Sequence, residues 1–362
     1  MPGVGNVKVL EIQGSRGRSA IFVGESIGNL GRYIPGGKTV IITDTHVRKH
    51  HGKNFPPCEV IEIDPGEGMK SLDTTRGIYE RLLDLEADRS TFVVGIGGGV
   101  ICDIAGFVAS TFLRGLKFGF VPSTLLSMVD ASVGGKNGVN LGGYKNMIGV
   151  INQPEFVLCD MDLLKTLHER EVRCGLAEVV KHASIADAEM FLYLEKHNEE
   201  ALKLDTKVIG KLVYDSMVIK SSIVNRDERE KGERRKLNFG HTFGHGIEKI
   251  YGFPHGEAVS MGMVLASALS VRMGLLSEKE AERIEGLLRK FRLPTRIALD
   301  RKRVLDALGK DKKRTADCIH FILLHGIGCA AVEEIRMTEW EEFLGGEGDI
   351  LLLPGSWSEK WT

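Results

Sequence analysis

Residues 91–112, TFVVGIGGGVICDIAGFVASTF, join an apolar run to a helical pattern through a block of glycines. The run 91–96 has the length and the β-branched content of a buried strand, and residues 101–112 carry apolar side chains at helical spacing. The glycine block predicts nucleotide binding, because glycines let the backbone approach a phosphate and a helix N-terminus offers free N–H groups. Its GxGGG spacing departs from the full GxGxxG fingerprint, so a tight structural turn is the alternative.

Strand-like and helical segments alternate on both sides of this block. Strand-like runs occupy residues 38–43, 59–63 and 118–121, and a helical pattern occupies residues 71–85. Alternation of this kind predicts a mostly parallel sheet with helices on its faces. We therefore expect an α/β fold with a Rossmann-like nucleotide-binding domain over residues 1–165. Asp44 follows the first run, where an acidic side chain often binds a ribose hydroxyl, although aspartate is also common in turns.

Beyond about residue 163 the chain changes to helical patterns with few β-rich runs. The candidate helices are residues 172–182, 206–225, 238–250, 256–273 and 278–291. Pro294 is expected to end the last of them. We therefore expect an all-helical second domain over residues 166–345, followed by an irregular C-terminal tail over residues 346–362.

Composition excludes several classes of protein. The formal net charge of the 362 residues is −1, so no global basic field attracts nucleic acid. No apolar run reaches the roughly 18 residues that a membrane span needs, and the N-terminal residues lack the pattern of a signal peptide. The six cysteines form no CxxC pair and are expected to be reduced thiols. These features predict a cytoplasmic globular protein with neither nucleic-acid nor membrane partners.

A second glycine-rich segment, DASVGGKNGVNLGGYKNMIG, covers residues 130–149. Its glycines predict a loop. Its hydrogen-bond donors are Lys136, Asn137, Asn140, Lys145 and Asn146. Glycine-rich backbone with interspersed lysine and asparagine suits a phosphorylated or carboxylated small molecule. The alternative is a solvent-exposed loop with ordinary surface lysines.

A group of histidines predicts a metal site. The sequence NFGHTFGH, residues 238–245, places His241 and His245 four positions apart, on one face of a helix. His255 follows ten residues later, and Glu178 lies in another helical segment, GLAEVVKH. Imidazole nitrogens and a carboxylate oxygen are suitable zinc ligands, and three of them leave a position for substrate or water. Spacing alone favours His241 and His245 as the pair, and structural histidines are the alternative.

Together these segments resemble the 3-dehydroquinate synthase family of sugar-phosphate cyclases. The matching motifs, in family order, are GIGGGVICDIAGFVASTFLRG, VPSTLLSMVDASVGGKNGVN, YKNMIG, GLAEVVKH, DERE, LNFGHTFGHGIE and HGEAVSMGM. The resemblance covers about residues 40–330. Glycerol dehydrogenases and iron-type alcohol dehydrogenases share the general fold but lack the VDASVGGK…KN block. The resemblance implies a nucleotide-binding domain and a helical domain, with the active site between them.

The resemblance also implies a metal-ligand set that differs from the one favoured by spacing. It implies that Glu178, His241 and His255 hold zinc, with cobalt or another divalent metal as an alternative. In the family pattern the residue corresponding to His245 is not a ligand, but faces the substrate and helps with proton transfer. The residue corresponding to Glu230 lies near the metal and its water.

Further site residues follow from the same resemblance. The implied substrate contacts are Asp130, Lys136, Lys145, Asn146, Lys181, Lys220, Arg234 and Asn238. The implied NAD contacts are Asp44, Glu67, Lys70, Gly98, Gly99, Val100, Asp103, Thr124, Asp130, Lys136 and Lys145. One late lysine among Lys310, Lys312 and Lys313 is expected to reach the site. Arg114 resembles a family arginine that reaches a substrate phosphate across a dimer interface, which implies a homodimer.

The implied reaction converts 3-deoxy-D-arabino-heptulosonate 7-phosphate to 3-dehydroquinate and phosphate, a lyase step of the shikimate pathway of aromatic amino acid biosynthesis. NAD would oxidise the C5 hydroxyl transiently, phosphate would leave by β-elimination, and reduction followed by an internal aldol closure would complete the product. The cofactor would therefore not be consumed.

Three other functions are compatible with these residues. A sister cyclase would act on sedoheptulose 7-phosphate or an analogue, which lacks the carboxylate that Lys220, Arg234 and Asn238 would bind. An NAD-linked polyol dehydrogenase would accumulate NADH and would have little use for so many anion-binding groups. A non-catalytic anion-binding protein would have lost a reactive group, and none is missing from the motifs.

Overall fold

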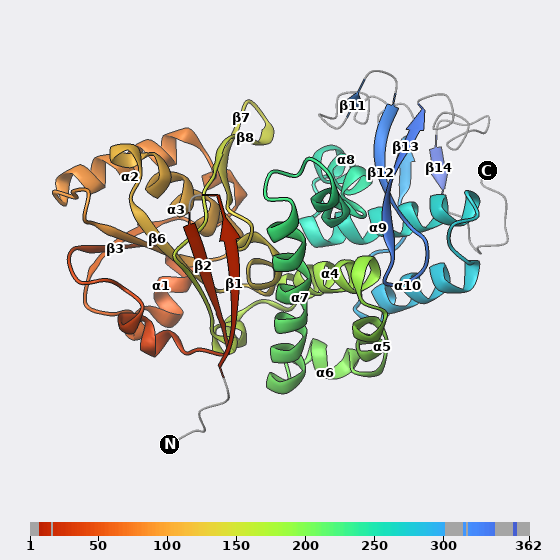
Figure 1. Ribbon diagram of the computed structural model, residues 1–362, viewed down its shortest axis with the longest axis horizontal. Helices are drawn as coiled ribbons and strands as arrows, with labels where there is room; N and C mark the ends of the chain where they lie inside the picture. The colour runs from red at the N-terminus through yellow and green to blue at the C-terminus, as the bar shows by residue number, and fades with distance from the viewer. Residues whose placement is uncertain (1–6, 16, 301–313, 316–317, 337–349, 353–362) are drawn as a thin grey trace. The chain divides into compact units, whose positions relative to one another are not determined.

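The computed structural model describes residues 7–15, 17–300, 314–315, 318–336 and 350–352 (Figure 1). The chain divides into two compact units. Unit 1 comprises Met1–Val172 and Thr206–Arg229, and unit 2 comprises Arg173–Asp205 and Glu230–Thr362. Among the described residues, no helix combines the length and the apolar character needed to cross a bilayer.

Unit 1 is built on a seven-stranded sheet with the strand order β1-β2-β9-β6-β5-β3-β4. The strands are β1 (Lys8–Gly14), β2 (Gly17–Val23), β3 (Thr39–Asp44), β4 (Glu59–Ile63), β5 (Phe92–Gly97), β6 (Lys117–Pro122) and β9 (Phe156–Cys159). The β1–β2 pair is antiparallel, and all other neighbours are parallel. Every residue of β3 and β5 is buried, as expected for central parallel strands. The predicted Rossmann-like sheet is confirmed.

Helices connect the parallel strands of this sheet. They are α1 (Thr45–His51), α2 (Leu72–Asp84) and α3 (Gly99–Thr111). Helix α3 packs closely on β5: a Cβ added at Gly95 would lie only 2.8 Å from the Cβ of Ala105. A Cβ added at Gly97 would lie 2.5 Å from the Ile101 side chain. These two glycines are therefore required by packing, which identifies the structural part of the glycine block.

The loop predicted over residues 130–149 is wrong for most of its length. Residues Lys136–Leu141 and Tyr144–Ile151 form an antiparallel hairpin, β7–β8. Gly142 and Gly143 both have positive φ, 58° and 78°, as two-residue hairpin turns require. Cβ atoms at Gly138 and Gly149 would each lie 2.5 Å from a backbone oxygen of the opposite strand. The glycines therefore permit close strand pairing, which a glycine-rich composition does not reveal.

Helix α7 (Thr206–Arg226) belongs to unit 1, although the sequence assigned it to the second domain. Lys8 Nζ lies 4.0 Å from the ring centroid of Tyr214, and the Gln13 N–H donates to Asn225 Oδ1 at 2.9 Å. The two residues that α7 contacts here precede it by about two hundred positions in the sequence. Local sequence patterns therefore could not reveal that α7 belongs to unit 1. Helix α4 (Glu169–Ala186) begins in unit 1 and continues in unit 2.

Unit 2 contains the predicted helical domain together with strands. Its other helices are α5 (Ala188–Lys196), α6 (Asn198–Leu202), α8 (His241–Tyr251), α9 (His255–Arg272) and α10 (Glu278–Lys290). Its strands are β10 (Ala298–Asp300), β11 (Arg314–Thr315), β12 (Cys318–Leu324), β13 (Ala330–Arg336) and β14 (Ile350–Leu352). The helical character is confirmed, but the domain is not all-helical. The β12–β13 hairpin packs on α9, where the Leu324 N–H donates to Ser270 Oγ at 3.0 Å.

Candidate active site

The glycine block ends at the N-terminus of α3. Gly98 is the N-cap, and because it is glycine, no side chain of the N-cap covers the first turn of the helix. A Cβ added at Gly98 would lie 3.1 Å from Thr124 Cγ2, and one at Gly99 would lie 3.2 Å from the Cβ of Ala131. Uncapped N–H groups at a helix start, with glycines that leave the backbone open, form a cradle for a phosphate. The predicted residues Gly98, Gly99, Val100 and Thr124 thus lie around one feature.

We expect Gly98→Ala to weaken NAD binding about tenfold or more, because the added methyl group fills the cradle and crowds Thr124. Gly77→Ala is the matched control, since Gly77 lies on α2 and a Cβ there meets no atom within 4 Å. Fluorescence titration with NADH measures both. Equal affinities for the two variants would remove Gly98 from the cofactor site.

Lys70 organises a second group of predicted cofactor residues beside α3. Its ammonium group, which is buried, forms an ion pair with Asp103 and donates to Asn146 Oδ1 at 2.5 Å. Burial raises the pKa of Asp103 to about 6, and the nearby Lys70 charge opposes this rise. Asn146, which accepts this hydrogen bond, has an unusual backbone conformation with a positive φ of 54°. The structure thus brings together Lys70, Asp103 and Asn146, which lie far apart in sequence.

Glu67 links this group to the β7–β8 hairpin. Asn140 Nδ2 donates to Glu67 Oε1 at 2.9 Å, and Lys145 Nζ lies 3.7 Å from the same oxygen. The Asn140 N–H also donates to the Lys70 carbonyl at 2.8 Å. The hairpin therefore positions Lys145 and Asn146 against the residues that follow β4.

Asp44 and Arg114 lie apart from this group along the chain. Asp44 ends β3 and caps α1, where its Oδ1 accepts from the Val47 N–H at 2.9 Å. Arg114 is exposed on the turn after α3 and has φ 70°. Because α3 has 13 residues, Arg114 is separated from the glycine block by a helix about 20 Å long. Within a single chain, Arg114 is therefore remote from the phosphate cradle at the α3 N-terminus.

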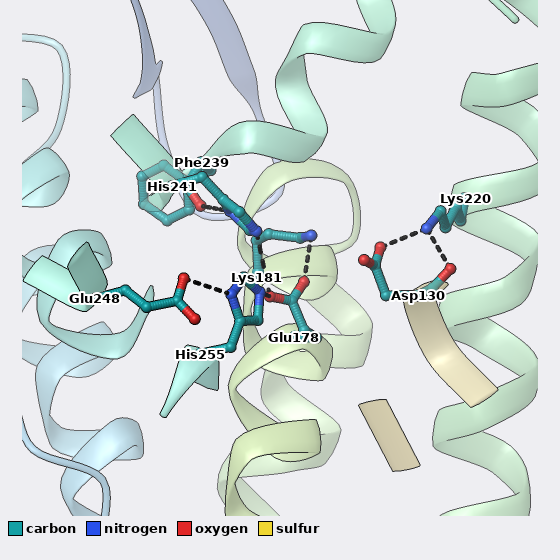
Figure 2. Close-up of polar contacts among 8 residues, drawn as sticks. All are labelled: Asp130, Glu178, Lys181, Lys220, Phe239, His241, Glu248 and His255. Carbon is teal, nitrogen blue, oxygen red and sulfur yellow. Dashed lines mark hydrogen bonds and ion pairs between the residues drawn. The ribbon is translucent and has the colours of Figure 1, made fainter. Parts of the chain in front are cut away.

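Asp130 and Lys220 form a partly buried ion pair within unit 1 (Figure 2). Lys220, on α7, donates to both the backbone oxygen and Oδ1 of Asp130, each at 2.5 Å. Asp130 lies in the π-helical turn Ser127–Ala131, and Lys136 begins β7 at an exposed position. The structure thus explains why Lys220 is buried in an amphipathic helix: its charge is balanced by a carboxylate.

In unit 2, Glu178 and two histidines, each from a different helix, come together. Glu178 on α4 is fully buried, and its Oε1 lies 3.5 Å from His241 Nε2 and 3.4 Å from His255 Nε2. His241 begins α8 and His255 begins α9. Glu178 Oε2 forms an ion pair with Lys181, one turn later on the same helix (Figure 2). The two oxygens of one carboxylate thus have different partners.

The second ring nitrogen of each histidine also has a partner. His241 Nδ1 lies 3.2 Å from the Phe239 carbonyl oxygen, and His255 Nδ1 lies 3.6 Å from Glu248 Oε2. Burial lowers the pKa of His241 well below its usual value. Burial also opposes the charged form of His255, but its contacts with Glu178 and Glu248 outweigh burial and raise its pKa to about 9.

These three residues fit a divalent metal ion. Their ligand atoms lie within 4.8 Å of one another. Zinc bonds of 2.0–2.2 Å in a tetrahedral arrangement would separate neighbouring ligand atoms by about 3.4 Å. The Glu178 to histidine distances of 3.4 and 3.5 Å match this separation. Two imidazoles and one carboxylate leave one position of a four-coordinate site open, as in catalytic zinc sites.

The other site residues predicted in unit 2 lie near this cluster in sequence. Asn238 Nδ2 donates to Glu230, whose φ is 57°. Arg234 lies in the 3-10 helix Glu233–Asn238 and is buried, with 3% of its surface exposed. The His245 ring centroid is 5.4 Å from that of His241 and 6.4 Å from that of His255. Lys310, Lys312 and Lys313 lie outside the described residues.

Glu248 belongs to this cluster and was missed by sequence reasoning. It lies on α8 at position i+7 from His241 and i+3 from His245, so the three side chains share one helix face. That spacing was visible in the sequence, but an acidic residue near the end of an amphipathic helix usually faces solvent. Only the side chain's burial, with 11% exposed, and its contact with His255 reveal its place.

Comparison with known proteins gives a consistent result along the chain. Residues 60–174 match the family model for the 3-dehydroquinate synthase N-terminal region, and residues 175–314 match the one for the C-terminal region. The boundary between the two matches, after residue 174, is close to the first boundary between the units, after Val172, although α7 lies in the C-terminal match and in unit 1. The chain is 42% identical over 318 residues to the 3-dehydroquinate synthase of Acetivibrio thermocellus, covering 84% of this chain and 88% of that protein. It is 44% identical to that of Campylobacter curvus, covering 85% and 90%.

Solved structures extend the comparison to related cyclases. The 2-epi-5-epi-valiolone synthase of Streptomyces hygroscopicus, with NAD+ and Zn2+ bound, has a TM-score of 0.82 at 28% identity, covering 94% of this chain and 97% of that one. A 2-deoxy-scyllo-inosose synthase in complex with carbaglucose-6-phosphate, NAD+ and Co2+ has a TM-score of 0.78 at 28% identity, covering 92% and 98%. A probable glycerol dehydrogenase of Sinorhizobium meliloti, at 15% identity and a TM-score of 0.58, shares the fold.

Proposed function

Because the chain belongs to the 3-dehydroquinate synthase family, we propose that it converts 3-deoxy-D-arabino-heptulosonate 7-phosphate to 3-dehydroquinate and phosphate. The observation that carries the proposal is the convergence of Glu178, His241 and His255, with Glu178 Oε1 at the separation from each histidine Nε2 that two zinc ligands would have, in a chain that is 40–44% identical to named synthases. As part of the shikimate pathway, the reaction would serve aromatic amino acid biosynthesis.

The two units supply different parts of the chemistry. In unit 1, the α3 N-terminus and the group around Lys70 and Glu67 would hold NAD. In unit 2, Glu178, His241 and His255 would hold the divalent ion. When bound, the metal supplies Lewis acidity at a substrate hydroxyl and NAD supplies a hydride acceptor that is regenerated within each turnover.

The protein's own side chains would bind the substrate and move its protons. The substrate carries a carboxylate and a phosphate, and the residues available to bind these anions are Lys136, Lys145, Asn146, Lys181, Lys220, Arg234 and Asn238. We assign His245 to proton transfer at the C5 hydroxyl. Its ring is near both metal-site histidines, so a hydroxyl held there would be within its reach.

The test is phosphate release from 3-deoxy-D-arabino-heptulosonate 7-phosphate with zinc and catalytic NAD, coupled to a dehydratase that detects 3-dehydroquinate. We expect equal amounts of phosphate and product, without accumulation of NADH. Continuous NADH accumulation would instead indicate a dehydrogenase and overturn the proposal.

A sister cyclase is the second candidate, because both solved cyclase structures described above share the fold over nearly their whole length. Their identity to this chain is 28%, against 42% and 44% for the two synthases. The higher identity favours the carboxylated substrate. Phosphate release from sedoheptulose 7-phosphate, and none from the carboxylated substrate, would decide for the sister cyclase.

We also propose a cytoplasmic homodimer in which Arg114 contacts the phosphate bound by the partner subunit. Arg114 is exposed and lies about 20 Å along α3 from the helix N-terminus that would hold NAD, so it is far from the cofactor of its own chain, and this supports a role in the partner's site. Arg114→Ala and His241→Ala should each be inactive, whereas a mixture allowed to exchange subunits should recover up to about a quarter of wild-type activity. In an equal mixture, half of the dimers would be hybrids of the two variants. Each hybrid would have one intact site out of two, so about a quarter of all sites would be active. No recovery despite demonstrated exchange would show that Arg114 does not act in the partner's site, and an active Arg114→Ala homodimer would place it outside the site altogether.

A further inference from the structure

We propose that Glu248 is a positioning residue for the metal site: its carboxylate holds the His255 ring so that Nε2 faces the position of the ion. The inference rests on the proposed metal site and concerns a side chain outside the ligand set. Figure 2 shows Glu248 and Glu178 in contact with the two different nitrogens of the His255 ring.

The local fold brings Glu248 to His255. Gly252 ends α8 in the left-handed conformation, with φ 71°, and its N–H donates to the Glu248 carbonyl oxygen at 3.0 Å. His255 begins α9 three residues later. The turn is therefore short enough to place the first side chain of α9 against the last turn of α8. Glu248 shares its face of α8 with His241, and its side chain is 11% exposed, so it points toward the metal site.

The geometry of the ring separates the roles of the two carboxylates. His255 Nε2 lies 3.4 Å from Glu178 Oε1, and Nδ1 lies 3.6 Å from Glu248 Oε2. The two nitrogens of an imidazole point in divergent directions, so Glu248 does not share an ion with Glu178 while His255 Nε2 binds it. A carboxylate at Nδ1 keeps the proton there, leaves the Nε2 lone pair for the metal, and raises the basicity of the ligand.

His255 needs such a partner more than His241 does. The His241 side chain is 9% exposed, and its Nδ1 faces a backbone carbonyl oxygen that the fold holds in place. The His255 side chain is 29% exposed and stands at the first position of its helix. A ring with more freedom loses more entropy when it binds a metal, so a charged outer partner that orders it in advance contributes more to affinity.

The test compares zinc affinities of the full-length protein by competition with a chelator. We expect Glu248→Ala to weaken zinc binding about 10- to 100-fold, and Glu248→Gln, which keeps an acceptor without the charge, to weaken it less. Glu282→Gln is the matched control, since Glu282 is exposed on α10 and should bind zinc as the wild type does. The visible absorption of the cobalt-loaded protein should also change in both Glu248 variants, because the ligand orientation changes.

The outcomes separate this inference from the proposed metal site. Wild-type zinc affinity and an unchanged cobalt spectrum in both Glu248 variants would overturn the role of Glu248 alone. A wild-type protein that takes up no zinc would overturn the metal site and this inference together. If Glu248→Ala does not fold without metal, Glu248→Gln, which has nearly the same shape, decides the question by its affinity and spectrum.

Discussion

His241→Ala is expected to strip zinc from the protein and to lower kcat about 10³-fold or more. The Nε2 atom of His241 is 3.5 Å from Glu178 Oε1, at the spacing of neighbouring zinc ligands. A catalytic metal supplies several kcal/mol of transition-state stabilisation, and about 1.4 kcal/mol corresponds to tenfold in rate. The substitution leaves the Glu178–Lys181 ion pair intact, so no buried charge loses its partner. Metal analysis after dialysis, together with steady-state kinetics, measures both effects.

His245→Ala is the matched variant, since it makes the same change one turn later on the same helix. We expect it to retain one zinc per chain and to lower kcat by about 10²- to 10⁴-fold, the usual contribution of general acid–base catalysis. Loss of zinc from His245→Ala with retention in His241→Ala would show that the ligand pair favoured by spacing is the true one. Retention of stoichiometric zinc in both variants would refute the ligand set.

The metal cluster shows how far sequence reasoning reaches. The residue types are visible in the sequence, because histidines and a glutamate are ordinary zinc ligands. The partners are not visible, because Glu178, His241 and His255 stand on three helices, and their meeting depends on tertiary packing. Spacing within one helix therefore favours His241 with His245. The resemblance to the family selected His255, and the structure places that residue 3.4 Å from Glu178.

Helices with a clear N-cap and one apolar face were predictable from the sequence, because both features are local. The pattern at residues 71–85 has a polar N-cap and a single apolar face, and the structure has α2 at Leu72–Asp84 with Ser71 as its cap. The β7–β8 hairpin was not predictable in the same way. Its glycines are needed for a turn with positive φ and for close contact between the strands. In the sequence, a segment with so many glycines looks like a loop.

A glycine within α9 is also required by close packing, which composition alone does not reveal. Gly262 lies in the middle of this helix, where glycine is unfavourable by roughly 1 kcal/mol relative to alanine. A Cβ there would lie 2.0 Å from the Gly240 carbonyl oxygen and 2.9 Å from the Gly244 backbone nitrogen. Gly262 therefore lets α9 lie against the start of α8, where His241 stands.

Gly262→Ala is consequently expected to destabilise the protein by about 3 kcal/mol or more, the upper range for overpacking, because the atoms in its way belong to the backbone. Gly286→Ala is the matched control: Gly286 lies within α10, a Cβ there meets no atom within 4 Å, and the change should stabilise by about 0.5–1 kcal/mol. Thermal unfolding of the metal-free proteins measures the difference. Because separating the two helices also displaces His241 from His255, zinc affinity should fall in Gly262→Ala and stay unchanged in Gly286→Ala. A Gly262→Ala protein as stable as wild type would mean that the helices have room to separate and that their close approach does not fix the metal site.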